Sequence, residues 1–233
     1  MTRRIYVVGT GTGVGKTTLC CALLYWARRH GVAAVPFKPA QSGPVGPDDD
    51  IHRLLRAASL PEGEAADACP HAFPAPLAPG LAEDPSPFFR PPAANIAPLA
   101  PVIANARARM HAFADRHAAQ LVLIEGAGGL HVPMPGGTWQ PAWIRALATD
   151  VLVVAPAELG TINHTILTID ALVALELPIA GFILSETHAD DDPSRDDNPQ
   201  VIATARTIRW LGTLPHASRS DAPDLLTPLL DAL

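Results

Sequence analysis

The stretch Gly9-Thr10-Gly11-Thr12-Gly13-Val14-Gly15-Lys16-Thr17-Thr18 combines residue types that bind phosphate. Apolar residues 5–8 precede it as a buried strand would, and residues 19–29 follow it with the pattern of a helix. A strand, a glycine-rich loop and a helix opened by Gly-Lys-Thr are typical of a P-loop, whose backbone N–H groups surround phosphate oxygens. Lys16 would contact the β- and γ-phosphates of a nucleoside triphosphate, and the Thr17 hydroxyl would bind Mg²⁺. The first glycine stands at position 9 instead of position 10, so the loop is one residue longer than the common form.

Three further polar residues stand at or near the ends of predicted strands. Lys38 follows the strand at 33–37 in a turn made rigid by Pro39, and Glu125 follows the apolar strand at 121–124. Asp50 is the best placed of three adjacent aspartates, which could instead be helix-start acids without a ligand. Because ligands of parallel sheets bind beyond the carboxyl ends of the strands, we expect these groups to lie near the P-loop.

Apolar strands alternate with helices along the chain, which predicts an α/β fold: a single P-loop NTPase-like domain over residues 1–233, with a parallel sheet and helices on both faces. The predicted strands are 5–9, 33–37, 121–124, 151–155, 179–184 and 212–214. The predicted helices are 16–30, 50–58, 99–117, 143–147, 161–175, 201–210 and 225–233. Many of the 25 prolines crowd residues 70–101, which predicts a long connection with polyproline-like pieces.

Composition excludes several classes of partner. The net charge is −6 without a basic stripe, so nucleic acid is not expected as a partner. No apolar run approaches the roughly 20 residues of a membrane span. The three cysteines, Cys20, Cys21 and Cys69, are odd in number and lack the spacing of metal ligands, which indicates a reducing, cytoplasmic setting.

Four motifs, in order and in register, resemble those of the dethiobiotin synthetase family. Each is weakly specific alone, but together they cover the chain from Arg4 to about Pro215 and match poorly only in the Pro-rich segment and the tail. They are the P-loop, Lys38-Pro39-Ala40-Gln41-Ser42-Gly43, Glu125-Gly126-Ala127-Gly128-Gly129 and Leu159-Gly160-Thr161-Ile162-Asn163-His164. The resemblance implies an ATP-dependent ligase of biotin biosynthesis. Such an enzyme carboxylates the vicinal diamine 7,8-diaminononanoate with CO₂ and closes a cyclic urea through a carbamic–phosphoric anhydride.

The resemblance also implies roles for individual residues. Catalytic contacts to phosphate, carbamate and substrate would come from Lys16, Lys38 and Thr12, and Mg²⁺ would be held by Thr17, Asp50 and Glu125. ATP would be bound by Gly13, Val14, Gly15, Lys16, Thr17, Thr18, Glu125, Gly126, Ala127, Gly128, Ser185, Glu186, Pro215, His216 and Ala217. The diamine would be bound by Thr12, Ser42, Gly160, Thr161, Ile162 and Asn163. In the family the loop at 160–163 comes from the partner subunit, which implies a homodimer with the site at its interface.

Two positions depart from the family pattern. Gly13 stands where the family often has Glu, and Ser185-Glu186 stands where it usually has an Asn, often Asn-Asp, for the nucleotide base. Two alternatives remain. One is a nucleotide-switch ATPase similar to chromosome-partitioning proteins, although the second lysine typical of their loop is missing at positions 11 and 12. The other is a paralogous ligase for another amine or acid, which the sequence does not separate because the substrate tail is recognised by shape.

Overall fold

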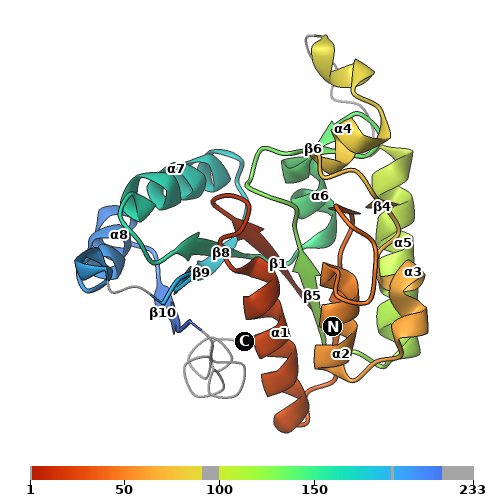
Figure 1. Ribbon diagram of the computed structural model, residues 1–233, viewed down its shortest axis with the longest axis horizontal. Helices are drawn as coiled ribbons and strands as arrows, with labels where there is room; N and C mark the ends of the chain where they lie inside the picture. Colours follow the sequence, from red (N-terminus) through yellow and green to blue (C-terminus); the bar gives the residue numbers. More distant parts are fainter. Residues whose placement is uncertain (1, 91–99, 190–191, 217–233) are drawn as a thin grey trace.

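The computed structural model describes residues 2–90, 100–189 and 192–216, and its centre is a sheet of six parallel strands (Figure 1). The strand order is β10-β9-β8-β1-β5-β2. The strands are β1 (Arg3–Gly9), β2 (Ala34–Phe37), β5 (Leu121–Glu125), β8 (Asp150–Pro156), β9 (Ile179–Ser185) and β10 (Trp210–Leu214). The inner strands β1, β5 and β8 are buried almost throughout, as expected where helices cover both faces.

The crossover helices form the two outer layers. Connections between parallel strands are right-handed as a rule, so connections running in opposite directions along the sheet lie on opposite faces. The helix α1 (Lys16–Arg29) leads from β1 toward β2 and packs beside α2 (Asp50–Ala58). The later connections run along the sheet in the opposite direction, from β2 toward β10. They contain α5 (Pro101–Arg116), α6 (Gln140–Leu147), α7 (Thr161–Ala174) and α8 (Asn198–Arg206). This architecture confirms the predicted parallel sheet with helices on both faces.

Some predicted boundaries are wrong for local reasons. The helix predicted at 201–210 instead ends at Arg206, because Thr207 takes a left-handed conformation with φ of 51° and Trp210 then begins β10. The helix predicted at 143–147 starts earlier, since Pro141 is tolerated in the first turn. The helix predicted at 225–233 lies outside the described residues.

The Pro-rich segment holds regular elements where the sequence predicts polyproline-like chain. Its short strand β4 (Ala72–Phe73) pairs in parallel with β3 (Gln41–Ser42). This pairing ties the segment to the chain that follows Lys38. The other short elements of the chain are η1 (Glu62–Glu64), α3 (Ala65–Ala68), α4 (Pro79–Glu83), η2 (Ser86–Phe89), β6 (Pro133–Met134), β7 (Thr138–Trp139) and η3 (Pro193–Arg195).

The described helices include none that is long and apolar enough to cross a membrane. The core lies between the sheet and its helices, where the largest fully buried side chains are Trp143, Tyr6, Phe37, Phe113 and Phe182. Three of these, Tyr6, Phe37 and Phe182, belong to the sheet strands β1, β2 and β9.

Candidate active site

A cavity of about 1050 Å³ opens at the carboxyl ends of β1, β5 and β2. Its walls come from the P-loop, the turn after β2, the start of α2 and two later loops. It is lined by Thr10, Gly11, Thr12, Gly13, Gly15, Lys16, Thr17, Thr18, Lys38, Gln41, Ser42, Asp50, Arg53, residues 76–79 and residues 125–132. The cavity therefore joins most of the residues predicted to bind phosphate and metal, together with Thr12 and Ser42 of the predicted diamine contacts.

The P-loop has the backbone geometry of an anion site at a helix N-terminus. Gly15 precedes α1 with φ of 94°, and a Cβ at this position would lie only 2.9 Å from the Cβ of Ser185. Glycine is therefore required both by conformation and by space. Lys16 folds back over the loop, where its Nζ donates a hydrogen bond to the Gly11 carbonyl at 2.8 Å. Burial lowers the pKa of Lys16, an effect that the charge of Glu125 only partly opposes.

Lys38, Glu125, Asp50 and Thr17 form one hydrogen-bonded cluster below the P-loop. The Lys38 ammonium lies 2.5 Å from Glu125 Oε1 and 2.9 Å from Asp50 Oδ2. The Thr17 hydroxyl lies 2.8 Å from Glu125 Oε1 and 3.1 Å from Asp50 Oδ1, and its single proton can be donated to either. Lys38 and Glu125 are 3% and 1% exposed, so their charges interact with little screening by water.

The cluster holds Lys38 and Asp50 in their charged forms. Burial acts to lower the pKa of Lys38, but the charges and hydrogen bonds of Glu125 and Asp50 outweigh it, and the pKa is raised above its ordinary value. Burial acts to raise the pKa of Asp50, but the Lys38 ammonium and the Thr17 hydroxyl outweigh it and the pKa is lowered. Near neutral pH the cavity therefore contains a fixed ammonium beside a fixed carboxylate.

The oxygen donors of this cluster fit Mg²⁺. Glu125 Oε2 is buried and has no hydrogen-bond partner among the residues that the structure describes, although a buried carboxylate oxygen normally has one. Carboxylate and hydroxyl oxygens are the hard donors that Mg²⁺ prefers, and this ion usually takes only one or two protein carboxylates. In the described chain no three His, Cys, Asp or Glu side chains group as a metal site, so phosphate and water oxygens would complete the coordination.

The three adjacent aspartates have separate environments. Asp49 caps α2, accepting a hydrogen bond from the His52 backbone N–H at 3.1 Å. Asp48 is exposed and pairs with Arg56 at 3.3 Å. Asp50 alone of the three contacts Lys38 and Thr17. The geometry thus favours Asp50, as the sequence suggested.

Gln140 is a buried residue of the site region that the sequence reasoning missed. Its Oε1 accepts hydrogen bonds from the Ala127 backbone N–H at 2.8 Å and from the Tyr6 hydroxyl at 3.2 Å. Its Nε2 donates to the Gly129 carbonyl at 2.6 Å. A Cβ on Gly126 would come within 2.9 Å of Gln140 Oε1, so the glycine allows this close contact. Gln140 therefore fixes the loop after Glu125. The one available signal was a polar residue at the start of an apolar helix.

The residues predicted to contact the base lie beside the P-loop but do not line the main cavity. Ser185 is buried against Gly15 at the end of β9. The Glu186 carboxylate accepts a hydrogen bond from the His216 backbone N–H at 3.0 Å and lies 3.9 Å from the Arg195 guanidinium. The structure thus brings Ser185, Glu186, Pro215 and His216 to neighbouring strand ends, and Ala217 lies outside the described residues.

The predicted diamine contacts separate into two groups. Thr12 and Ser42 line the cavity. Gly160, Thr161, Ile162 and Asn163 instead start α7, and they are absent from the described wall of that cavity. The preceding Leu159 is 85% exposed. Within one chain, therefore, the structure does not bring the loop at 160–163 to the P-loop cavity.

Comparison with solved structures supports the fold assignment alone. The cell division ATPase MinD of Pyrococcus furiosus matches with a TM-score of 0.55 and 18% identity, covering 100% of this chain and 98% of that chain. Chloroplast FtsY of Physcomitrella patens matches with a TM-score of 0.55 and 16% identity, covering 100% of this chain and 65% of that chain.

Comparison with protein families and curated sequences is more specific. Residues 3–224 match a family model described as an AAA domain. The chain is 45% identical over 214 residues to the ATP-dependent dethiobiotin synthetase BioD of Anaeromyxobacter dehalogenans (strain 2CP-C), covering 91% of this chain and 90% of that protein. It is 37% identical over 227 residues to the protein of the same name from Mycobacterium bovis (strain BCG / Pasteur 1173P2), covering 94% and 90%. The chain therefore belongs to the dethiobiotin synthetase family.

Proposed function

We propose that this chain is an ATP-dependent dethiobiotin synthetase, a ligase that forms carbon–nitrogen bonds in biotin biosynthesis. It converts 7,8-diaminononanoate, CO₂ and ATP into dethiobiotin, ADP and phosphate. The observation that carries the proposal is the buried Lys38–Glu125–Asp50–Thr17 cluster beneath a P-loop, in a chain whose curated relatives carry this name. The cavity has room for a phosphate chain and a second, smaller substrate side by side.

Phosphoryl transfer in this reaction acts on a carbamate. The carbamate forms first, when one amine of the diamine captures CO₂ and releases a proton. A carbamate oxygen then attacks the γ-phosphorus of ATP, forming the O–P bond of a carbamic–phosphoric anhydride while the bond to ADP breaks. Both partners are anions, so the main tasks of the protein are to align them and to neutralise charge. Lys16 and Lys38 would perform the second task, because both lysines line the cavity in which the two anions would meet.

The metal would be held by the Thr17 hydroxyl and by the carboxylates of Asp50 and Glu125. The partnerless Oε2 of Glu125 supports this assignment. Bound Mg²⁺ supplies positive charge that stabilises the transferring phosphoryl group. Lys38 keeps the two carboxylates close together before any ligand binds.

The second chemical step closes the ring. The remaining amine attacks the carbonyl carbon of the anhydride, a C–N bond forms, the C–O bond to phosphate breaks, and a proton leaves the nitrogen. Thr12 and Ser42 lie on the cavity wall near the phosphate end, where their hydroxyls can orient the diamine. The glycine-rich loop after Glu125, which Gln140 holds in place, can bring its own backbone close to the bound diamine.

The enzyme is proposed to be a homodimer whose partner completes each site. The N-terminus of α7, with Asn163, offers unpaired N–H groups and a positive helix end that suit the substrate carboxylate. These residues do not reach the cavity of their own chain, and Leu159, Leu167 and Val173 leave exposed apolar surface on or next to α7. A partner subunit would cover this surface and bring the loop to the cavity. The odd cysteine count supports a cytoplasmic setting for the enzyme.

The alternative of a nucleotide-switch ATPase is not favoured. The match to MinD is below 25% identity and concerns the fold, whereas the relatives that share 37–46% of their residues are dethiobiotin synthetases. A ligase for another amine is distinguished by the product formed from each diamine.

The proposal is tested by mass spectrometry of the reaction product. Purified protein is mixed with ATP, Mg²⁺, bicarbonate and 7,8-diaminononanoate, and in parallel reactions with diamines of shorter or longer carboxylate tail. We expect the cyclic urea of diaminononanoate to form faster than that of the other diamines. A faster reaction with another diamine, or phosphate release at full rate without any diamine, would contradict the proposal.

A further inference from the structure

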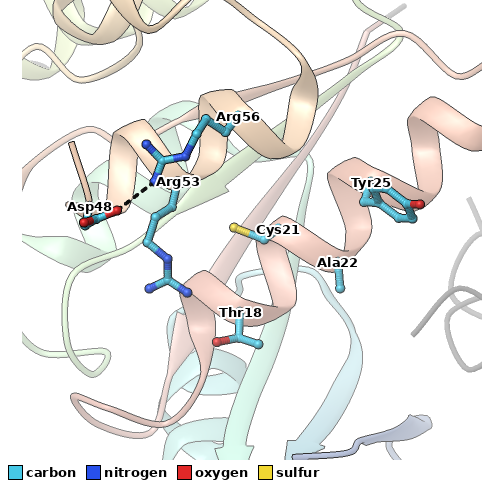
Figure 2. Close-up of a pocket in the computed structure, with 7 residues that line it drawn as sticks. All are labelled: Thr18, Cys21, Ala22, Tyr25, Asp48, Arg53 and Arg56. Atoms are coloured by element: carbon cyan, nitrogen blue, oxygen red, sulfur yellow. Dashed lines mark hydrogen bonds and ion pairs between the residues drawn. The ribbon is translucent and has the colours of Figure 1, made fainter. Parts of the chain in front are cut away.

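Arg53 lies between the active-site cavity and a second hollow that the proposed chemistry does not use. It follows Asp50 by three residues on α2, so both side chains lie on the same side of the helix. It lines the main cavity together with Lys16, Thr17 and Thr18. It also lines a hollow of about 450 Å³ between α1 and α2, with Thr18, Cys21, Ala22, Tyr25, Asp48 and Arg56 (Figure 2). Figure 2 shows the Arg53 guanidinium directed toward the first turn of α1, beside Thr18.

Among the described residues, the Arg53 guanidinium has no hydrogen-bond or ion-pair partner, in contrast to Arg56 on the same helix. Within the described part of the chain it makes no hydrogen bond and no ion pair within 4 Å, although it is half-buried. Arg56 is neutralised by Asp48 and Glu62, each at 3.3 Å. A partly buried charge without a counterion is costly and is normally compensated by a ligand or a partner. The guanidinium thus lines the cavity with N–H donors that no described side chain or carbonyl accepts.

The surroundings of Arg53 select an anion with several oxygens. The N-terminus of α1 and Lys16 already give this end of the cavity a positive potential. The acidic groups nearby are Asp48, which pairs with Arg56, and Asp50, which pairs with Lys38. Arg53 is far enough from Asp50 to form no ion pair, yet its charge contributes to lowering the pKa of that carboxyl. The guanidinium therefore completes a positive rim that the local carboxylates leave uncompensated.

We propose that Arg53 binds the phosphate chain of ATP from the α2 side of the site, opposite the P-loop backbone. A guanidinium donates two parallel N–H groups to phosphate oxygens, and this match adds both affinity and orientation. Thr18 is one residue beyond the Thr17 hydroxyl, so an arginine directed at Thr18 stands where the phosphate chain crosses the start of α1. This inference rests on the proposed function, in which ATP and the diamine share the cavity. It assigns Arg53 to ATP and not to the diamine.

The test is nucleotide affinity, measured by calorimetry on the wild type, Arg53→Ala, Arg53→Lys and the matched control Arg56→Ala. The ligands are ATP with Mg²⁺ and inorganic triphosphate, which carries the phosphates without base or ribose. We expect Arg53→Ala to raise the Kd of both ligands about tenfold or more, because a hydrogen bond to a charged group is lost. Arg53→Lys should recover part of the affinity, since it keeps the charge but loses the fork. Arg56→Ala should change the Kd less than threefold, and the melting temperature of Arg53→Ala should stay near that of the wild type.

Three results would overturn the inference. The first is an unchanged Kd for ATP in Arg53→Ala. The second is a loss of ATP affinity with full affinity for triphosphate, which would move the contact to ribose or base. The third is a raised KM for the diamine alone, which would assign the guanidinium to the other substrate. A wild type that binds ATP but forms no cyclic urea would refute the proposed function and leave the assignment of Arg53 intact.

Discussion

The two ends of the proposed nucleotide site differ in how firmly their polar groups are held. At the phosphate end, Lys38 and Glu125 are almost fully buried and share short contacts with Asp50 and Thr17. At the base end, Glu186 and His216 are joined by one hydrogen bond at the surface, next to residues outside the described chain. The phosphate end is fixed before any ligand binds, whereas among the described residues the base end offers few side chains that could select a ligand.

This difference indicates which part of the reaction each end controls. In the proposed reaction the preorganised charges would act on the transferring phosphoryl group, where such charges lower the barrier most. The chain has 17 lysine and arginine residues, of which two are lysines. Both of these, Lys16 and Lys38, are at the phosphate end. We therefore expect variants at the phosphate end to reduce turnover strongly, and variants at the base end to change affinity modestly.

The largest effect is expected from Lys38→Ala. Removing one preorganised charge of this kind costs about 3 kcal/mol, which corresponds to a loss of turnover of about 100-fold or more. ATP affinity should fall less, because Lys16 and the loop backbone still contact the phosphates. Steady-state kinetics and calorimetry measure the two effects separately.

The control for this variant is stability. Lys38→Ala leaves Glu125 buried without its cation, so a lower melting temperature is expected as well. Kinetics must be measured well below that temperature, where circular dichroism shows a folded protein. Unchanged turnover of the folded variant would remove Lys38 from the reaction and refute the phosphate-end account.

The second prediction concerns the loop at 160–163, which does not line the cavity of its own chain. Lys38→Ala and Asn163→Ala subunits, each inactive alone, should regain activity when mixed, because one site of the mixed dimer then has both native residues. Random exchange in a symmetric dimer would restore about a quarter of the wild-type activity. A mixture of Lys38→Ala with the double variant Lys38→Ala/Asn163→Ala is the control and should stay inactive. A fully active monomer at micromolar concentration would contradict the shared site.

The smallest effect is expected at the base end. Ser185 offers one rotating hydroxyl and is packed against Gly15, and an oxygen of the Glu186 carboxylate already accepts the His216 N–H. One neutral hydrogen bond is worth about 1 kcal/mol, so we expect ATP to be preferred over CTP or GTP by less than about tenfold. Competition between nucleotides at fixed diamine concentration measures this ratio. A preference of a hundredfold or more would mean that other groups read the base.

The phosphate end was largely predictable from sequence because its signals are local. A buried strand followed by glycines and Gly-Lys-Thr specifies β1, the loop and α1, and strand ends located Lys38 and Glu125. The capping pattern of α2 did not by itself separate Asp50 from Asp49. That distinction depends on which way the first turn of the helix faces.

The missed features all depend on contacts between distant segments. Gln140 acts through Tyr6 and Gly129, and no local pattern joins these three positions. Residues 76–79 form a cavity wall because β4 pairs with β3, yet the Pro-rich sequence around them has no helical or strand period. Arg53 resembles any helix-surface arginine in the sequence, and only the packing of α1 against α2 shows that no described residue pairs with it.

In the proposed mechanism, the P-loop site drives ring closure through an anhydride made from the carbamate. The most direct test of this mechanism is the fate of oxygen when the reaction runs on CO₂ and bicarbonate freshly labelled with oxygen-18. Because a carbamate oxygen attacks the γ-phosphorus and leaves with it, the released phosphate should carry one labelled oxygen for each dethiobiotin formed. Phosphate without label, at full yield of product, would contradict the account.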